Sequence, residues 1–444
     1  MQVDVGKIID GARINRLHSL VVGVGLFVLI NDAYDLVSMG IVIPRIAEQW
    51  GVSRAEFGIA LSVSMFGVLI GSAASGLLGD YIGRKNTMIL TVLISGIFMF
   101  LTTTATSMNE LVIYRFFTGL GAGGCIPITI AHASEYMPER VRNRLVVLMY
   151  TGAGMGSVFA GFAAPTILGN WGWQGIFVVG GVISFVAMFL VMFLLPESVK
   201  FMIARGSDPN KVGAVLERVE PEFKASEDDE YVIHEHAHSD KGSPIQELFG
   251  EGQTGITLLA WLAMFGNQFL LFAMVLWMPT LFTQGGLAEK TALFILALYN
   301  VGGVIGGWAF SIFADKYDPA RVLTFTYPLA GISVALLGIS LGSVPILVTV
   351  AIVTGFFSIG SSFCLGPYVA SLYPTRARST GIGWALSIGR VGAILSPLVA
   401  GWAIGQGYAT RAIMLLLAMG PVLCGVAVLW LRRLEYRVLH AETV

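Results

Sequence analysis

Charged residues are scarce in this sequence. Asp, Glu, Lys and Arg together make up 12% of the 444 residues, and the formal net charge is −1. Soluble domains usually carry about 25% charged residues, so roughly half of the charge that a water-facing surface needs is missing. Hydrophobic residues reach 55%, and the mean hydropathy is +0.76. These values exclude a soluble globular protein, and the balanced charge excludes a basic face for nucleic acid.

Cysteine is also rare. Cys125, Cys364 and Cys424 lie far apart, each within an apolar run. This placement permits neither a disulfide framework nor a zinc site. We expect three buried thiols, no metal and no cofactor.

Long apolar runs, by contrast, are abundant. A bilayer-spanning helix needs about 20 apolar residues. Backbone amides inside lipid must be satisfied within the segment, which favours helices, and the alternating segments of a membrane barrel are missing. The sequence therefore predicts an all-α polytopic membrane protein with twelve transmembrane helices. The expected spans are 18–44, 54–78, 86–106, 109–134, 145–169, 173–195, 254–283, 289–314, 321–342, 345–371, 379–404 and 410–431.

A long polar stretch divides these spans into six and six. It contains His234, His236 and His238 beside an acidic run. Histidines in an exposed charged loop are expected to be solvated, so no metal site is predicted there and the loop is interpreted as a solvated linker. The expected organisation is an N-terminal segment 1–17, a six-helix bundle 18–195, a linker loop 196–253, a second six-helix bundle 254–431 and a tail 432–444.

The distribution of Lys and Arg predicts the orientation. If the N-terminus is cytoplasmic, only Arg45, Arg54, Lys290 and Arg411 of the 27 basic residues fall in loops on the opposite side. Cytoplasmic loops carry the excess of Lys and Arg in membrane proteins. Both termini are therefore expected to be cytoplasmic.

Two motifs of the first half recur in the second half. The turn 79–85 after the second span has a weaker echo at 314–321, and the segment 133–142 recurs as 370–378. Six spans repeated in one orientation predict two pseudo-symmetric six-helix bundles, with a substrate site between them near mid-membrane.

These motifs resemble those of the major facilitator superfamily of secondary transporters. The loop motif G-x-x-x-D-x-x-G-R-[RK] is present as Gly76, Asp80, Gly83, Arg84 and Lys85. The fourth-span motif R-x-x-x-G-x-G-x-G fits loosely, and the fifth-span signature of drug–proton antiporters fits poorly. The resemblance covers about 18–432 and implies the major facilitator fold.

Within this superfamily the sequence most resembles the aromatic acid–proton symporters. The first-span segment Asp32-Ala33-Tyr34-Asp35 is similar to their D-G-x-D motif, with alanine in place of glycine. The segments 134–136 and 195–198 also look like that family. The resemblance implies import of a small, aromatic carboxylate by proton symport through alternating access. It also implies a monomer in a bacterial-type inner membrane, with protons, the carboxylate and the lipid bilayer as its partners.

Four charged residues lie within the expected spans. Asp32 and Asp35 lie near the middle of the first span, Arg115 lies in the outer half of the fourth, and Arg390 lies near the midplane of the eleventh. A charge at mid-membrane is costly and suggests a functional role with a partner. We expect Asp32 and Asp35 to serve proton coupling, Asp32 as the better proton carrier and Asp35, paired with Arg115, as the better conformational lock. Arg390 is expected to bind the substrate carboxylate. The alternative is that all four form static ion pairs.

Other polar residues near mid-depth are further candidates for the substrate site. Interhelical hydrogen bonding is at least as good an explanation for those in the seventh and eighth spans. His132, near the cytoplasmic end of the fourth span, is a candidate proton relay, although a satisfied interfacial histidine is the more common case. The substrate-binding candidates are Arg390, Arg115, Tyr34, Asn267, Tyr299 and Asn300.

Charges at the cytoplasmic ends of the spans suggest a gate. Asp80 can accept hydrogen bonds from a helix N-terminus and pair with an arginine, and such contacts must break when the cytoplasmic side opens. Topology and lipid-headgroup contact are the simpler explanation for some of the arginines. The candidate gate residues are Asp80, Arg84, Glu135, Arg142, Asp315 and Arg378.

The sequence lacks the motifs of several enzyme classes. The sequence contains no H-E-x-x-H, no G-x-S-x-G and no G-x-x-x-x-G-K-[ST] motif, so neither a metalloprotease or serine hydrolase nor a P-loop ATPase is predicted. We expect no enzyme activity. A sugar carrier, a carrier of another organic anion and a transporter-like sensor all remain open from sequence.

Overall fold

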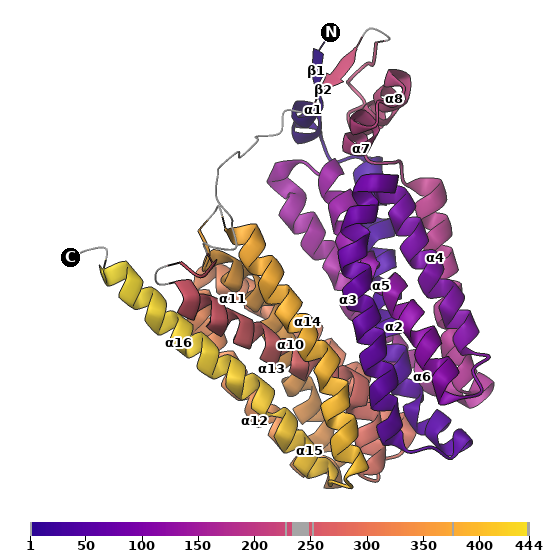
Figure 1. Cartoon of the computed structure of the whole chain (residues 1–444), viewed down its shortest axis with the longest axis vertical. Coiled ribbons are helices and arrows are strands. Elements are labelled where there is room, and N and C mark those ends of the chain that lie inside the picture. Colours follow the sequence, from indigo (N-terminus) through magenta and orange to yellow (C-terminus); the bar gives the residue numbers. More distant parts are fainter. Residues whose placement is uncertain (1, 227–228, 233–247, 251–252, 375–376, 442–444) are drawn as a thin grey trace. The chain divides into compact units, whose positions relative to one another are not determined.

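A computed structural model describes residues 2–226, 229–232, 248–250, 253–374 and 377–441. Within these residues the protein is almost entirely helical (Figure 1). Eleven of the helices are long and apolar enough to cross a membrane. One of them, α6 (Glu139–Leu194), is 56 residues long and changes direction at Gly172, whose φ of 63° and ψ of −169° are not helical. Counting α6 as two segments gives twelve spans, which confirms the predicted fold class.

The remaining membrane helices follow the predicted runs closely. In the first half they are α2 (Arg16–Trp50), α3 (Phe57–Ile82) after the short turn η1 (Arg54–Glu56), α4 (Arg84–Thr102) and α5 (Met108–Tyr136). In the second half they are α10 (Gln253–Gln284), α11 (Glu289–Lys316), α12 (Pro319–Ile339) followed by η2 (Ser340–Gly342), α13 (Val344–Ser371) and α14 (Arg378–Gly405). The last span consists of α15 (Thr410–Leu417) together with α16 (Met419–Ala441).

The chain forms two compact units. Unit 1 contains residues 1–36, 66–156 and 174–239, and unit 2 contains residues 37–65, 157–173 and 240–444. The helices α2, α3 and α6 therefore each contribute to both units. The division predicted from the sequence repeat assigns the whole of each helix to one bundle, whereas the compact units follow the contacts.

In unit 1, glycines allow the helices to approach closely. A Cβ atom at Gly123 of α5 would lie 2.1 Å from the carbonyl oxygen of Val68 on α3, and one at Gly121 would lie 2.5 Å from the amide nitrogen of Ser95 on α4. Small residues at such contacts let helices pack in lipid by van der Waals interactions, where no hydrophobic force brings them together. The high glycine content has this physical origin.

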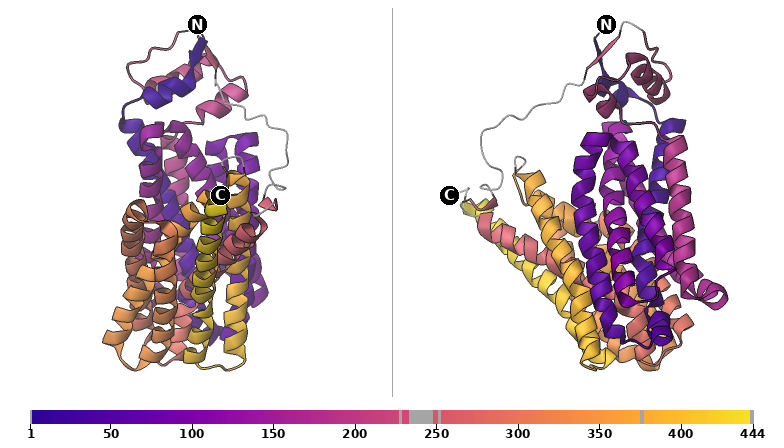
Figure 2. Two further views of the ribbon diagram at one scale, coloured as in Figure 1. Left: turned by 90° about the vertical axis from the view of Figure 1, so that its left-hand side faces the viewer. Right: turned by 45° about the vertical axis from the view of Figure 1, so that its right-hand side comes forward.

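A small folded element lies at one end of unit 1 (Figure 2). The strands β1 (Gln2–Asp4) and β2 (Glu230–Val232) pair in parallel, and Gln2 is the partner of Glu230. The helices α1 (Val5–Gly11), α7 (Val199–Ala204) and α8 (Pro209–Val219) accompany them. We call β1, α1, α7, α8 and β2 the cap, and the end of unit 1 that carries them the capped end.

The apolar core of unit 1 continues into the cap. Val5 and Ile9 of α1 are buried together with Leu216 and Val219 of α8. The Nη2 atom of Arg140, at the start of α6, donates to the carbonyl oxygen of Ala12 at 2.6 Å and so attaches the cap to the bundle. Residues 196–226 of the expected linker loop thus contain packed helices, because the N-terminal segment supplies the apolar side chains that α8 packs against. The three loop histidines lie outside the described residues.

In unit 2, the helices α11 and α13 are in very close contact. A Cβ atom at Gly355 of α13 would lie 1.8 Å from the carbonyl oxygen of Tyr299 on α11, and one at Gly302 of α11 would lie 2.1 Å from that of Ile352. No side chain fits at either position. A Cβ atom at Gly366, also on α13, would meet no other atom within 4 Å.

These two glycines of α13 give a matched pair of variants. Gly355→Ala forces the two backbones apart, and overpacking of this kind typically lowers the free energy of unfolding by about 1–3 kcal/mol. Gly366→Ala meets open space, and alanine is the better helix former by about 0.5–1 kcal/mol, so stability is expected to stay the same or rise. Thermal unfolding in detergent can be followed with a thiol-reactive dye, because Cys125, Cys364 and Cys424 are buried and free. Equal midpoints in the two variants would contradict the close contact.

Candidate functional site

A buried ion pair lies inside unit 1. The Nη1 atom of Arg115 on α5 lies 2.9 Å from Oδ1 of Asp35 on α2, and the two side chains are only 2% and 3% exposed. The guanidinium carbon lies 5.6 Å from the centroid of the Phe177 ring, and Nη1 lies 3.5 Å from the sulfur of Met99. The structure confirms the predicted pairing of Asp35 with Arg115. Removing one partner of a buried pair typically costs about 3–5 kcal/mol, because the other charge is then left uncompensated, so each of these two residues requires the other.

The neighbours of Asp35 on α2 differ in their surroundings. Asp32, one turn earlier, is half-buried. Tyr34, assigned to the substrate site from sequence, is fully buried, and its hydroxyl donates to the carbonyl oxygen of Ile176 at 2.8 Å. This hydrogen bond and burial give Tyr34 a packing role between α2 and α6 in this structure.

Arg390, the second predicted substrate-binding arginine, lies on α14 in unit 2 and is half-buried. Glycines on either side of it bring α14 close to α10: a Cβ atom at Gly392 would lie 2.4 Å from the carbonyl oxygen of Phe265, and one at Gly389 would lie 3.0 Å from Cγ of Gln268. The guanidinium is therefore carried on a helix whose backbone position is fixed by its neighbour.

The three other polar candidates of unit 2 are engaged inside the bundle. The Oδ1 atom of Asn267 accepts from the hydroxyl of Tyr327 at 3.1 Å, and the hydroxyl of Tyr299 lies 3.0 Å from that of Ser358. Asn300 donates to the carbonyl oxygen of Leu296 at 2.9 Å. These contacts favour the hydrogen-bonding explanation that the sequence left open, because the polar atoms already have partners on their own or neighbouring helices.

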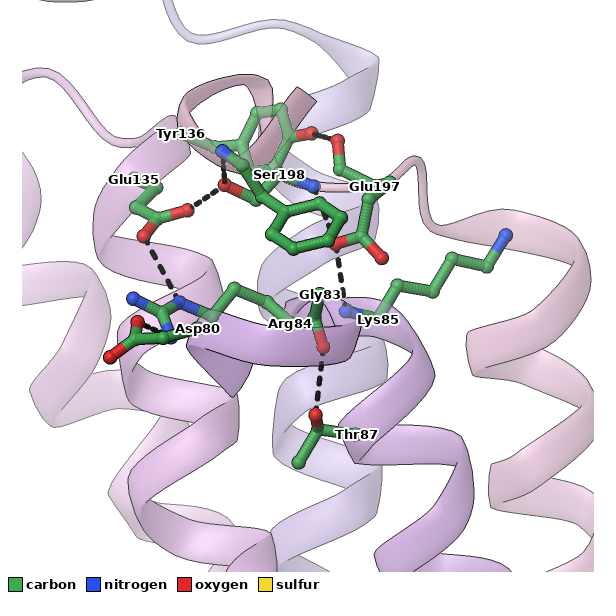
Figure 3. Close-up of polar contacts among 10 residues, drawn as sticks. Asp80, Gly83, Arg84, Lys85, Thr87, Glu135, Tyr136, Glu197 and Ser198 are labelled. Carbon is green, nitrogen blue, oxygen red and sulfur yellow. Dashed lines mark hydrogen bonds and ion pairs between the residues drawn. The ribbon is translucent and has the colours of Figure 1, made fainter. Parts of the chain in front are cut away.

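Several of the predicted gate residues come together at the capped end (Figure 3). Arg84, at the start of α4, lies between two carboxylates: its Nη1 is 2.5 Å from Oδ1 of Asp80 and its Nε is 3.3 Å from Oε1 of Glu135. The Asp80 side chain is 70% exposed, whereas that of Glu135 is 13% exposed. The other carboxylate oxygen of Glu135 accepts a hydrogen bond from the hydroxyl of Ser198. We call these four residues the gate cluster.

A fifth residue, Glu197, was missed as a site residue by the sequence analysis. Its Oε1 accepts from the backbone nitrogen of Lys85 at 3.0 Å and therefore caps the N-terminus of α4. Gly83, just before α4, has a φ of 96°, and a Cβ atom there would overlap the Glu197 carboxylate. Tyr136 of α5 donates from its hydroxyl to the Glu197 carbonyl oxygen at 2.5 Å. The segment 195–198 was noted only as a family motif, and its structural task is to tie α4 and α5 to the cap (Figure 3).

The gate cluster borders a pocket of about 550 Å³ that also includes Gly79 and Lys200. Arg142, predicted to share the cluster, instead lies 3.7 Å from the carboxylate of Asp10 in the cap and donates to the carbonyl oxygen of Met137. In the second half, Arg378 is exposed at the start of α14. The side chain of Asp315 lies outside the described part of the chain.

The gate cluster and the ion pair lie at different depths. Met99, which contacts Arg115, is fifteen residues after Arg84 on α4, and a rise of 1.5 Å per residue puts them about 22 Å apart along the helix. The mixed charges near the surface and the buried pair are therefore separate groups of charges within unit 1.

Unit 2 contains a further set of contacts that the sequence did not predict. Arg45 of α2 holds Glu289 of α11 with two nitrogens: Nη2 lies 2.6 Å from Oε2, and Nε lies 3.0 Å from Oε1. Close by in sequence, a Cβ atom at Gly40 would lie 2.4 Å from the carbonyl oxygen of Leu276 on α10. The hydroxyl of Ser62 on α3 donates to the carbonyl oxygen of Ile394 on α14 at 2.7 Å. These contacts join residues 37–65 to the C-terminal helices.

Comparisons with known proteins agree with this architecture. Residues 24–342 and 291–443 match the model of the Major Facilitator Superfamily. The 4-hydroxybenzoate transporter PcaK of Pseudomonas putida is 32% identical over 432 residues, which cover 96% of this chain and 95% of that protein. The gallate transporter of Pseudomonas putida is 31% identical over 96% of this chain and 94% of that protein.

A solved structure supports the fold alone. The xylose transporter XylE from E. coli, in a partially occluded inward open conformation, superimposes with a TM-score of 0.72 at 13% identity and covers 93% of this chain and 97% of its own. With the family model, the full-length relatives and the twelve spans together, the chain belongs to the Major Facilitator Superfamily and is a multi-pass membrane transporter rather than an enzyme.

Proposed function

We propose that this protein imports a small aromatic carboxylate together with protons by alternating access. One observation carries the proposal: the buried Asp35–Arg115 pair, next to the half-buried Asp32, lies in a chain whose full-length relatives transport 4-hydroxybenzoate and gallate. The relatives support the substrate class, and the buried charges support coupling to protons. Both termini are proposed to be cytoplasmic in a bacterial-type inner membrane, from the distribution of Lys and Arg.

Coupling to protons has a simple electrical reason. A carboxylate that enters against an inside-negative potential costs about 2.3 kcal/mol per charge per 100 mV. One co-transported proton cancels the charge, and a second makes uptake electrogenic. The Arg115 guanidinium holds Asp35 in an ion pair, and we assign the gain and loss of the proton to Asp32.

Transport by purified protein in proteoliposomes tests the proposal. Labelled 4-hydroxybenzoate should accumulate when the outside is made acidic, and unlabelled substrate inside should drive counterflow without a proton gradient. Counterflow of xylose instead of the aromatic acid would favour a sugar carrier. Binding of 4-hydroxybenzoate, measured as a rise in the thermal unfolding midpoint, without counterflow would favour a sensor.

Arg390→Lys tests recognition of the carboxylate. An arginine fork matches a carboxylate through two parallel hydrogen bonds, whereas lysine is a point charge. We expect the dissociation constant for 4-hydroxybenzoate to rise at least about tenfold, the effect of losing about 1.4 kcal/mol, although the charge is kept. Unchanged affinity in isothermal titration would exclude direct bidentate binding by Arg390.

Asp32→Asn tests proton coupling. The amide cannot take up a proton at this position, so pH-driven accumulation should be lost, while counterflow, which needs no net proton movement, should remain at least partly intact. Both rates are measured in the same proteoliposomes. Full pH-driven accumulation by the variant would remove Asp32 from the coupling role.

Asp80→Asn, like Asp32→Asn, replaces a carboxylate with an amide, but at the capped end. It removes the ion pair with Arg84, about 22 Å along α4 from the level of Arg115. We expect slower transport, with a dissociation constant for 4-hydroxybenzoate within about threefold of the wild type, a difference of less than 1 kcal/mol. Loss of binding by a folded variant would show that the gate assignment is wrong.

A further inference from the structure

Unit 1 contains a group of buried polar atoms that lack protein partners. Within the described residues, no hydrogen-bond partner is found for Nδ2 of Asn31, Oγ of Ser95, Oγ1 of Thr129 or either ring nitrogen of His132. All four residues are at most 1% exposed. Most buried polar groups in proteins are hydrogen-bonded to protein or water, and leaving one unsatisfied costs about 1–3 kcal/mol. So many such atoms in one bundle require an explanation.

These residues lie on three helices that pack against one another. Ser95 and Thr91 are on α4, Cys125, Thr129 and His132 are on α5, and Asn31 is on α2. The hydroxyl of Ser184 on α6 donates to Oδ1 of Asn31 at 2.8 Å, which leaves the amide nitrogen of Asn31 available. We call Asn31, Thr91, Ser95, Cys125, Thr129 and His132 the polar column.

Contacts between the helices show how the residues of the column follow one another. The sulfur of Cys125 lies 3.9 Å from Oγ1 of Thr91, which joins α5 to α4 midway. A Cβ atom at Gly25 of α2 would lie 3.1 Å from the methyl group of Thr129, one turn before His132. On α5 the column runs from Cys125 to His132, which is about 10 Å along the helix. Ser95 of α4 extends it to the level of Gly121, since a Cβ atom at Gly121 would lie 2.5 Å from the Ser95 amide nitrogen.

Titratable groups stand at both ends of the column. At the inner end, Asp32 directly follows Asn31 on α2, and Asp35 lies one turn further along the same helix. At the other end, the His132 ring lies 5.2 Å from that of Tyr136, and the charges of Arg84 and Lys85 act on it. The column therefore connects the proposed proton-binding carboxyl groups with the capped end, where the gate cluster lies.

We propose that the polar column holds ordered water and carries protons between Asp32 and the capped end, with His132 as the relay. This inference rests on the proposed proton symport. A neutral imidazole accepts a proton on one nitrogen while it releases one from the other, so the ring stays neutral overall and ends in its other tautomer.

A purely structural histidine accounts less well for these observations. Such a residue normally satisfies one ring nitrogen with a carbonyl or carboxylate, as His18 does in this protein, where Nδ1 contacts Oδ1 of Asn15 at 2.9 Å. Both nitrogens of His132 lack a protein partner among the described residues, although its ring is 1% exposed. Water bonds to both nitrogens satisfy this requirement.

Three variants of the full-length protein test the relay in proteoliposomes. His132→Leu removes both ring nitrogens, and Thr129→Val removes an unpartnered hydroxyl with little change of shape. Thr118→Val is the matched control, because the buried Thr118 hydroxyl on the same helix already donates to the carbonyl oxygen of Tyr114 at 2.8 Å. Each is assayed for pH-driven 4-hydroxybenzoate uptake, for proton entry reported by an internal pH dye, and for counterflow.

We expect His132→Leu to slow proton entry and pH-driven uptake at least tenfold and Thr129→Val to slow both severalfold, while counterflow stays within twofold of the wild type. Thr118→Val should match the wild type in all three assays. Equal loss of counterflow and pH-driven uptake in Thr129→Val, or no loss of proton entry in either column variant, would overturn the relay while leaving symport itself in place. A wild-type protein without pH-driven uptake would overturn symport and the relay together.

Discussion

The ion pair between Asp35 and Arg115 is the contact on which the organisation of unit 1 depends. Two charges inside an apolar bundle are tolerated only because they neutralise each other and because Phe177 and Met99 surround the guanidinium. A change in the charge of either partner alters the energy of holding α2 against α5. In the proposed symport, proton binding near this pair therefore acts on the packing of α2 against α5, since these helices extend from the capped end of unit 1 through its interior.

Close helix contact makes such a pair possible. Glycines let α5 approach α3 and α4 until backbone atoms touch, and the same device joins α11 to α13 in unit 2. At these distances polar side chains can bond between helices, as Tyr299 does with Ser358. In lipid these bonds and van der Waals contacts hold the helices together. The scarcity of charge and the abundance of glycine thus have one physical reason. A protein in lipid can bury only a few charges, and closely packed helices bring the partners of those charges within reach.

The sequence predicted the features that depend only on where a residue lies along the chain and along its helix. The spans, the buried cysteines and the pairing of Asp35 with Arg115 follow from hydropathy and depth alone. The direction in which Tyr34 and Asn267 point does not, because these helices are apolar on nearly all faces and no polar stripe marks the side that faces a neighbour. The pairing of β1 with β2 and the capping of α4 by Glu197 join segments that are distant in sequence. No local sequence pattern predicts such contacts. Arg45 was noted for topology alone, and its partner Glu289 lies in the other half of the sequence.

A proton route inside one bundle must not be open along its whole length, since a continuous path would dissipate the gradient that drives uptake. The polar column meets this condition at its inner end. Asn31, its member on α2, lies about one turn before Asp35, and Phe177 and Met99 surround the guanidinium that Asp35 holds. A proton that moves along the proposed column is therefore taken up by Asp32, because the paired charges and the apolar side chains around Arg115 follow it. The polar residues of the column and the apolar side chains around Arg115 thus have complementary tasks in the proposal: the first admit a proton as far as Asp32, and the second keep it from passing further.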